Sequence, residues 1–262
     1  MEEEFDRQNE EYREVEIEKS NIIVLGDTGS GKTYMLKCIA KAIGVPIFIS
    51  SATSLTSSGY VGDDVESILS GLLRICDFNI EKAEHGIVVI DEIDKIRKSS
   101  PGVSITKDVG GECVQQGLLK IVEGAVVGVP PQGGRKHPEQ PLLYINTKNI
   151  LFIGLGSFVG LEGIINERIK SSGKIGFKIE EKKGVADDDN VFSKVEQEDL
   201  MDFGMIPEFV GRFPVLVNTN KLSVDELKRV LTEPRGALVK QYRKLMKMDG
   251  VDLSFDDDAV KG

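Results

Sequence analysis

Long hydrophobic runs and closely spaced cysteines are both missing from this sequence. No stretch approaches the roughly 20 consecutive apolar residues of a membrane-spanning helix. The first residues, Met1 to Asp6, are mostly acidic, unlike the positively charged start of a secretory signal. The three cysteines, Cys38, Cys76 and Cys113, form no C-x-x-C pair. We therefore expect a cytoplasmic protein with reduced thiols and no structural zinc site.

Net positive charge is also lacking. The 262 residues carry a formal charge of −10 at pH 7, which argues against broad electrostatic attraction to nucleic acid or to an anionic membrane. We expect neither as a partner. The composition, with 40% hydrophobic and 29% charged residues, is that of an ordinary soluble globular protein. The length suits one large domain, or one domain plus part of another.

Short β-rich runs alternate with longer helical runs from Asn21 onward, which predicts an α/β fold with a parallel sheet flanked by helices. The expected strands are 21–25, 46–50, 86–90, 149–154 and 213–217. The expected helices are 32–43, 63–79, 110–123, 160–171 and 223–247, the last opening with a Ser223/Glu226 capping box. Polar, glycine- or proline-rich stretches predict loops at 97–111, 129–141 and 170–199. Residues 251–260 resemble a strand followed by a helix start, as if the chain stopped within a domain.

The most informative motif follows the first expected strand. Gly26-Asp27-Thr28-Gly29-Ser30-Gly31-Lys32-Thr33 matches G-x-x-x-x-G-K-[ST] in the strand–loop–helix context of a P-loop. Glycines let backbone N–H groups surround a phosphate, and the following helix directs its N-terminus at the same anion. Lys32 would reach the terminal phosphates, and Thr33 would offer its hydroxyl to Mg²⁺. The alternative, a flexible turn, fits the flanking segments less well, so we expect Asp27 to Thr33 to bind a nucleoside triphosphate.

A second motif, 87–94, is an apolar strand that ends in adjacent carboxylates. Successive side chains on a strand point to opposite sides, so Asp91 and Glu92 can take different tasks. We expect Asp91 to hold Mg²⁺ through water and Glu92 to polarise the attacking water as general base. The alternative is a strand that ends in a solvated acidic turn. Asp94 is expected at the surface or in an ion pair.

Two further segments leave alternatives open. Arg212, in the run 206–214, is either a buried structural cation or an arginine finger offered to a neighbouring subunit's γ-phosphate, which would require an oligomer. Tyr60 and Val61 lie between Gly59 and Gly62 in a polar loop. Their side chains either fold back onto the protein or grip something.

Together these segments, from about Ser20 to the end of the chain, resemble the ClpX family of AAA+ unfoldases, which feed substrates to the ClpP peptidase. The resemblance rests on 59–62, 88–96, 130–138 and 206–212. It implies an AAA+ P-loop NTPase fold, ATP and Mg²⁺ as cofactors, and a homo-hexamer. It also implies ClpP and unfolded or tagged proteins as partners.

The resemblance further assigns residues to roles. Tyr60 and Val61 would form a first pore loop and 104–111 a second, while Arg212 would be the arginine finger. A first group, at the pore entrance, would help to select degradation tags: Arg135, Lys136 and His137. A second group, an exposed tripeptide, would dock on ClpP: Ile175, Gly176 and Phe177. From the residues alone, the first group also fits a solvated turn, and the second a local hydrophobic contact that holds the loop.

Departures from the family pattern are also visible. Asp27 stands where the family usually has proline, and no N-terminal four-cysteine zinc module, upstream Val-Ile-Gly-Gln segment or second-sensor Gly-Ala-Arg is present. Ser157 is the candidate first sensor. We expect a lead-in at 1–20, an AAA+ large domain at 21–220, and the incomplete start of a small domain at 221–262.

The nucleotide-binding motifs, taken with the resemblance to the ClpX family, imply an ATP-dependent unfoldase subunit without peptidase activity of its own. One alternative is a nucleotide-binding chain that does not hydrolyse ATP, as the missing adenine and sensor segments would suggest. The closest alternative within the class is an HslU-like unfoldase, against which the Arg-Lys-His and Ile-Gly-Phe segments argue. A helicase-loader type of AAA+ protein is disfavoured by the acidic charge.

Overall fold

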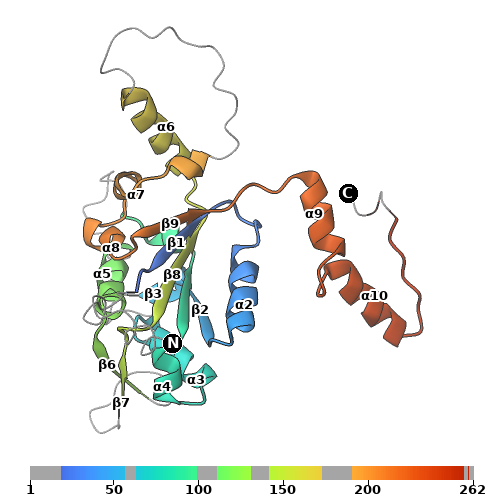
Figure 1. The fold of residues 1–262 in the computed structure, drawn as a ribbon, viewed down its shortest axis with the longest axis horizontal. Helices are drawn as coiled ribbons and strands as arrows, with labels where there is room; N and C mark the ends of the chain where they lie inside the picture. Colours follow the sequence, from blue (N-terminus) through green and yellow to red (C-terminus); the bar gives the residue numbers. More distant parts are fainter. Residues whose placement is uncertain are drawn as a thin grey trace, which may run out of the picture. The chain divides into compact units, whose positions relative to one another are not determined.

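The computed structural model describes residues 19–56, 63–98, 111–130, 142–172, 191–256 and 259. These residues form two compact units, one that ends at Thr219 and one that begins at Asn220 (Figure 1). The larger unit contains the P-loop and the carboxylate-ended strand.

A five-stranded, fully parallel sheet forms the centre of the larger unit, in the order β2-β5-β8-β1-β9. Its strands are β1 (Ile22–Leu25), β2 (Ile47–Ser51), β5 (Ile87–Asp91), β8 (Leu151–Gly156) and β9 (Val215–Asn218). Each overlaps an expected strand. The predicted α/β fold, with a parallel sheet flanked by helices, is therefore confirmed.

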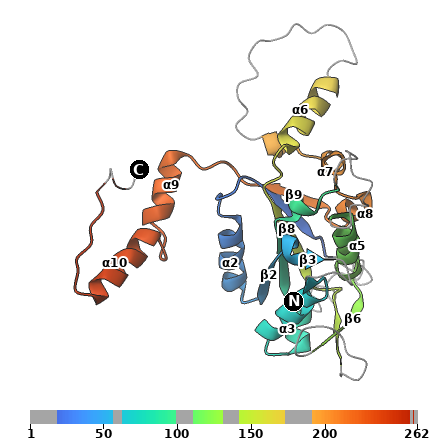
Figure 2. The same ribbon diagram turned by 180° about the vertical axis from the view of Figure 1, so that it is seen from behind.

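Helices surround this sheet in the larger unit (Figures 1 and 2). They are α2 (Lys32–Ile43), α3 (Ser67–Ile75), α4 (Ile80–Glu84), α5 (Gly111–Val122), α6 (Leu161–Ser172), α7 (Gln197–Phe203) and α8 (Pro207–Gly211), with short 3-10 turns η2 (Ala52–Ser54), η3 (Ile93–Ile96) and η4 (Val191–Lys194). Two small sheets complete the unit. β3 (Leu55–Thr56) pairs with β4 (Asp63–Asp64), and β6 (Val126–Val129) forms an antiparallel hairpin with β7 (Leu143–Asn146).

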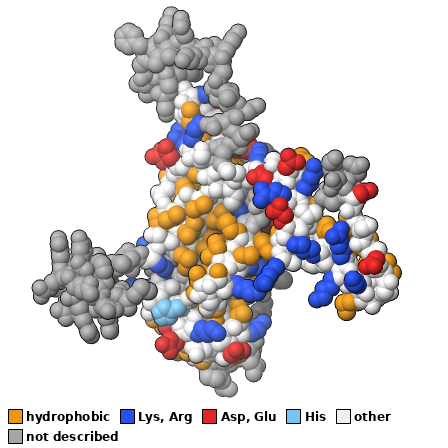
Figure 3. All heavy atoms as spheres, turned by 45° about the vertical axis from the view of Figure 1, so that its right-hand side comes forward, with side chains coloured by type: hydrophobic (Ala, Val, Ile, Leu, Met, Phe, Trp, Pro, Cys, Tyr) orange, Lys and Arg blue, Asp and Glu red, His pale blue; other side chains and the backbone are white. Residues whose placement is uncertain are grey.

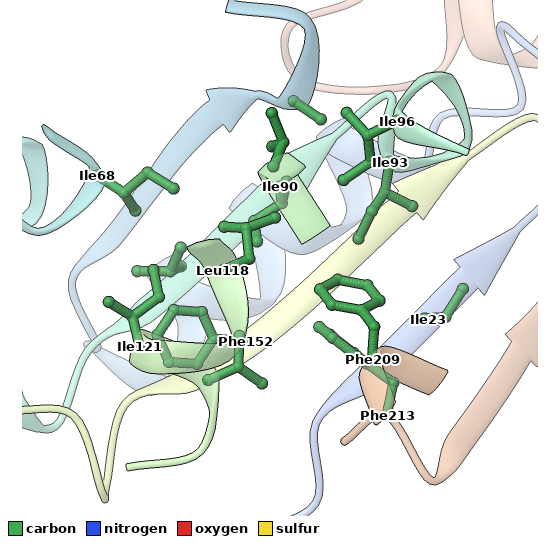
Figure 4. Close-up of a cluster of buried hydrophobic side chains, with 14 of the residues drawn as sticks. Ile23, Ile68, Ile90, Ile93, Ile96, Leu118, Ile121, Phe152, Phe209 and Phe213 are labelled. Atoms are coloured by element: carbon green, nitrogen blue, oxygen red, sulfur yellow. The ribbon is translucent and has the colours of Figure 1, made fainter. Parts of the chain in front are cut away.

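The two faces of the sheet are covered unequally. One face supplies Ile23 and Ile90 to the main core, where they meet residues of α3, α5 and α8 such as Ile68, Leu118 and Phe209 (Figure 4). The other face packs Val24 and Val89 against Leu36 and Ala40 of α2. On the surface of the larger unit, hydrophobic side chains gather into a patch (Figure 3). Helix α2 itself exposes Tyr34, Met35, Ile39 and Ile43.

The helix expected at 63–79 is shorter than predicted. Its first residues, Asp63 and Asp64, pair with β3 instead, and α3 begins at Ser67. It ends at Ile75 because Asp77 and Phe78 adopt left-handed backbone angles. Backbone pairing and a positive-φ turn therefore override helix propensity here.

The smaller unit contains α9 (Val224–Thr232) and α10 (Leu238–Met248), where one helix was expected. The Ser223/Glu226 capping box is present, with the Glu226 amide 3.3 Å from Ser223 Oγ. The single-helix prediction is wrong: α9 ends at Thr232, just before Pro234, and α10 begins only at Leu238. Pro234 lacks an N–H and Gly236 is a poor helix former, so neither favours a continuous helix. The strand expected from Val251 is also wrong: 251–256 are without regular structure.

None of the helices in the described parts of the chain is both long and apolar enough to cross a membrane.

Candidate nucleotide-binding site

The carboxyl ends of β1, β2, β5 and β8 lie at one edge of the sheet because these strands run parallel. β1 lies between β8 and β9. The next strand of the sheet along the chain, β2, lies at the far edge beyond β8 and β5, whereas the last strand, β9, lies on the opposite side of β1, so the strand order reverses at β1. In open α/β sheets, ligands bind beside the carboxyl ends of strands at such a reversal of strand order. The P-loop follows β1, Asp91 is the last residue of β5 and Ser157 follows β8, so all three lie at this edge.

The loop from Gly26 to Gly31 requires its glycines. Gly29 and Gly31 have φ angles of 86° and 83°, the left-handed region that other residues rarely adopt. At Gly26 a Cβ atom would collide with Thr219 Oγ1. Gly31 caps α2, which begins at Lys32. The helix N-terminus therefore faces the loop, an arrangement that suits an anion.

Lys32 is nearly buried in this loop. Its Nζ donates hydrogen bonds to the carbonyl oxygens of Gly26 and Asp27, at 2.6 and 2.8 Å. Burial of the ammonium lowers the pKa of Lys32, although Asp91 and other nearby carboxylates oppose this shift. A cation held here can contribute its charge to phosphates bound by the same loop.

Thr33 and Asp91 meet across the site. Thr33 Oγ1 donates to Asp91 Oδ2 at 3.2 Å, and the Glu92 amide donates to Asp91 Oδ1 at 2.8 Å. Mg²⁺ is usually held by one or two protein ligands together with substrate phosphates and waters. In the described ranges, no cluster of three or more His, Cys, Asp or Glu side chains offers a metal site by itself. The Thr33–Asp91 pair beside a phosphate loop therefore fits a magnesium nucleotide.

Glu92 has a strained backbone and a carboxylate that hydroxyls of β2 and η2 hold in place. Its φ of 57° is unusual for a residue with a side chain, a strain that often accompanies function. Its Oε2 accepts hydrogen bonds from Ser51 Oγ at 2.7 Å and Thr53 Oγ1 at 3.0 Å. Sequence reasoning missed these two hydroxyls. Only the sheet register, which pairs Ser51 with Asp91, brings them there.

Asp94 forms an ion pair, one of its two expected alternatives, but is buried. It is buried at 4% exposure, contacts Lys95 Nζ at 3.1 Å and accepts a hydrogen bond from Ser157 Oγ at 3.3 Å. The expectation of a surface residue or an ion pair is met by the ion pair, while η3 places Asp94 beside the end of β8 rather than at the surface. Ser157, the candidate first sensor, thus lies at the site through this contact.

These groups border one cavity of about 530 Å³, within the range of small-molecule sites. Its lining comprises Thr28, Gly29, Gly31, Lys32, Thr33, Tyr34, Ser51, Asp91, Glu92, Asp94, Lys95, Gly156 and Ser157.

Arg212 lies outside the lining of this cavity. Its guanidinium is paired with Glu123, with Nη2 2.9 Å from Oε1. The side chain is 52% exposed, which argues against a buried structural cation. The remaining expected site residues lie outside the described parts of the chain: Tyr60, Val61, Arg135, Lys136, His137, Ile175, Gly176 and Phe177, together with 104–110.

A parallel α/β sheet with a P-loop after its first strand and acidic residues after a neighbouring strand defines a P-loop NTPase. Residues 17–216 match the family described as AAA domain (Cdc48 subfamily), and the chain belongs to this family.

The chain is also similar to proteins named "ATP-dependent Clp protease ATP-binding subunit ClpX". It is 52% identical over 248 residues to the one from Bacteroides thetaiotaomicron, covering 95% of this chain and 60% of the relative. To the Porphyromonas gingivalis protein it is 49% identical over 253 residues, with 97% and 61% covered. To the Treponema denticola protein it is 52% identical over 248 residues, with 94% and 60% covered. The expected ClpX resemblance is confirmed, and the chain spans about three fifths of the length of these relatives.

Proposed function

We propose that this chain binds and hydrolyses ATP as the motor part of a ClpX-type unfoldase. The observation that carries the proposal is the contact between Thr33 Oγ1 and Asp91 Oδ2, which adjoins Glu92 in a cavity bordered by the P-loop. A threonine hydroxyl, an aspartate and a glutamate in this order are the groups needed to hold a magnesium nucleotide and to activate water.

Each residue would have a distinct task. The amides of 27–33 would surround the phosphates, with Lys32 supplying positive charge. Thr33, and Asp91 through water, would hold Mg²⁺, which when bound neutralises charge on the phosphates. Glu92 would orient the attacking water and take up its proton, with Ser51 and Thr53 holding the carboxylate in place. Arg212 would act on the nucleotide of a neighbouring subunit.

The unfolding activity is proposed from the relatives' names and the sequence resemblance. The relatives are named as ATP-binding subunits of Clp protease. By this likeness the chain would form a cytoplasmic homo-hexamer, pass unfolded or tagged substrates to ClpP, and depend on ClpP for peptide cleavage. Tyr60 and Val61 would grip substrate, the 135–137 segment would select it, and the 175–177 segment would dock on ClpP.

ATP turnover measured against protein concentration, with Glu92→Gln as the matched control, tests the proposal. We expect turnover to rise steeply with concentration and to vanish in Glu92→Gln, while ATP binding is retained in both proteins. Tight ATP binding without turnover at any concentration would contradict hydrolysis and would leave a nucleotide-binding chain. Turnover per subunit independent of concentration, measured down to concentrations at which the protein sediments as a monomer, would contradict the role of Arg212 between subunits.

A further inference from the structure

Arg212 ends a short helix that α5 contacts at both ends. Helix α8 spans Pro207–Gly211, and the two helices lie side by side in Figures 1 and 2. At the start of α8, the amide of Ile206 donates to Gln115 Oε1 at 2.9 Å. At its end, Glu123 Oε1 accepts from Arg212 Nε at 3.1 Å and contacts Nη2 at 2.9 Å. Gln115 and Glu123 lie in α5 and directly after it.

The backbone of Arg212 is fixed separately from its side chain. Asn21 Nδ2 donates to the Arg212 carbonyl at 2.9 Å, and Asn21 Oδ1 accepts from the Phe152 amide. Beyond the backbone, however, an arginine side chain retains many rotamers and loses much freedom when it is ordered. Among the described residues, the ion-pair partner of the Arg212 guanidinium is Glu123. In this structure the guanidinium therefore lies against Glu123.

The geometry of the pair leaves one end of the guanidinium available. Arginine carries five N–H donors in a planar fork, and this contact uses the edge formed by Nε and Nη2. Among the described residues Nη1 has no hydrogen-bond partner, so its donors remain for an anion. The side chains of both partners are about half exposed, Arg212 at 52% and Glu123 at 44%, so the pair lies at a surface that another subunit could approach.

We propose that Glu123 is a positioning residue that orients Arg212 towards the nucleotide of a neighbouring subunit. This inference rests on the proposed function, in which Arg212 acts between subunits. An exposed ion pair contributes little to stability, whereas displacement of a catalytic group by about 1 Å can reduce a rate by about 100-fold. The pair should therefore affect turnover far more than folding.

The same helix also contacts the segment that follows Glu92. Gln115 Nε2 donates to the carbonyl of Ile96 in η3 at 2.7 Å, and Gln115 is fully buried. Helix α5 thus joins the end of the catalytic strand of one subunit to the arginine that this subunit would offer to the next. Glu123 would be the residue of this connection that contacts the Arg212 side chain.

The first measurement is steady-state ATP turnover of the purified protein with Glu123→Gln, compared with Arg212→Ala. We expect Glu123→Gln to lower kcat about tenfold with KM for ATP within about twofold, because orientation is lost but not the nucleotide site. Arg212→Ala should lower kcat about 1,000-fold, as removal of an arginine finger does. Glu112→Gln is the matched control, since it removes a carboxylate from α5 that pairs with Lys98 instead. It should keep wild-type turnover and the same unfolding midpoint as Glu123→Gln.

Mixed assemblies separate positioning from a merely structural role. Glu92→Gln subunits cannot activate water but retain both Arg212 and Glu123. When mixed in excess with Glu123→Gln subunits, they should raise turnover per Glu123→Gln subunit several-fold, because they supply a correctly oriented arginine. Glu92→Gln mixed with Arg212→Ala should give the same kind of restoration.

The outcomes are distinguishable. Restoration of Arg212→Ala but not of Glu123→Gln would overturn the role of Glu123 and leave the proposed function intact. Failure of both mixtures would overturn the action of Arg212 between subunits, and the positioning role with it. Wild-type kcat in Glu123→Gln would also overturn the inference.

Discussion

Thr33 donates a hydrogen bond to Asp91, a residue 58 positions later, at 3.2 Å. The two residues belong to different motifs, one at the start of α2 and the other at the end of β5. They meet because β1, β8 and β5 are neighbouring parallel strands, whose carboxyl ends share one edge of the sheet. In the proposed function, this contact marks the place where Mg²⁺ would be held.

Replacement of the Thr33 hydroxyl tests this relationship. We expect Thr33→Val, which keeps the side-chain shape, to weaken ATP binding about tenfold in the presence of Mg²⁺ and to change it little in excess EDTA, because the hydroxyl would serve the metal. Titration of a fluorescent ATP analogue under both conditions measures the effect. Thr33→Ser, which keeps the hydroxyl, is the control. Equal weakening with and without Mg²⁺ would contradict the assignment.

Ser51 should influence turnover through Glu92. Ser51→Ala removes the hydroxyl that lies 2.7 Å from Glu92 Oε2. We expect kcat to fall about three- to tenfold with ATP affinity unchanged, a part of the 100- to 10,000-fold typical of a general base. Ser54→Ala is the control, since Ser54 Oγ donates to a backbone carbonyl at 2.8 Å. Unchanged kcat in Ser51→Ala would show that Glu92 is oriented without it.

Gln115 should contribute to stability as a buried polar link. Gln115→Leu would leave the Ile96 carbonyl and the Ile206 amide without their partner. An unsatisfied buried group costs about 1–3 kcal/mol, so the free energy of unfolding in urea should fall by at least about 1 kcal/mol. Gln116→Leu, at the next and exposed position of α5, should change it by less than about 0.5 kcal/mol. Similar values for both variants would contradict the prediction.

Lys19 should make stability depend on pH. Its Nζ donates to the carbonyls of Thr147 and Ile150, and burial lowers its pKa from 10.5 to about 8. Between these two values the unfolded chain binds more protons than the folded chain, so Lys19 adds stability as pH rises from about 8 to 10.5 and none of this gain is present below pH 8. Urea unfolding across this range should show the free energy of unfolding rising for the wild type relative to Lys19→Met. A pH-independent difference would contradict the prediction.

Much of the architecture could be predicted because its signals are local. The apolar runs in 21–25 and 86–90 and the glycines before Lys32 report strands and a phosphate loop from neighbouring residues alone. Helix ends were less predictable. The break at Pro234 and Gly236 contains a local signal that the expected single helix overlooked, whereas the end of α3 depends on positive-φ residues, Asp77 and Phe78, that carry no glycine signature.

The site was predicted in part for the same reason. Lys32, Thr33, Asp91 and Glu92 lie in contiguous motifs, and the structure places Lys32 and Thr33 with Asp91 and Glu92 at one cavity. Ser51 and Thr53 lie in no motif, and Asp94 is buried because η3 turns back under β8. Sheet order, which is not written in any short segment, brings these residues to the cavity.

The sequence by itself determined the class of this protein, since the P-loop and the acidic strand end are short patterns whose chemistry depends on residue type and spacing. Tertiary structure alone decided which distant groups serve those motifs. Glu123 meets Arg212 across 89 residues, and Ser51 meets Glu92 across 41. Such contacts arise when parallel strands and packed helices bring remote segments together, because burial of apolar side chains selects the packing, and the packing in turn sets the polar partners.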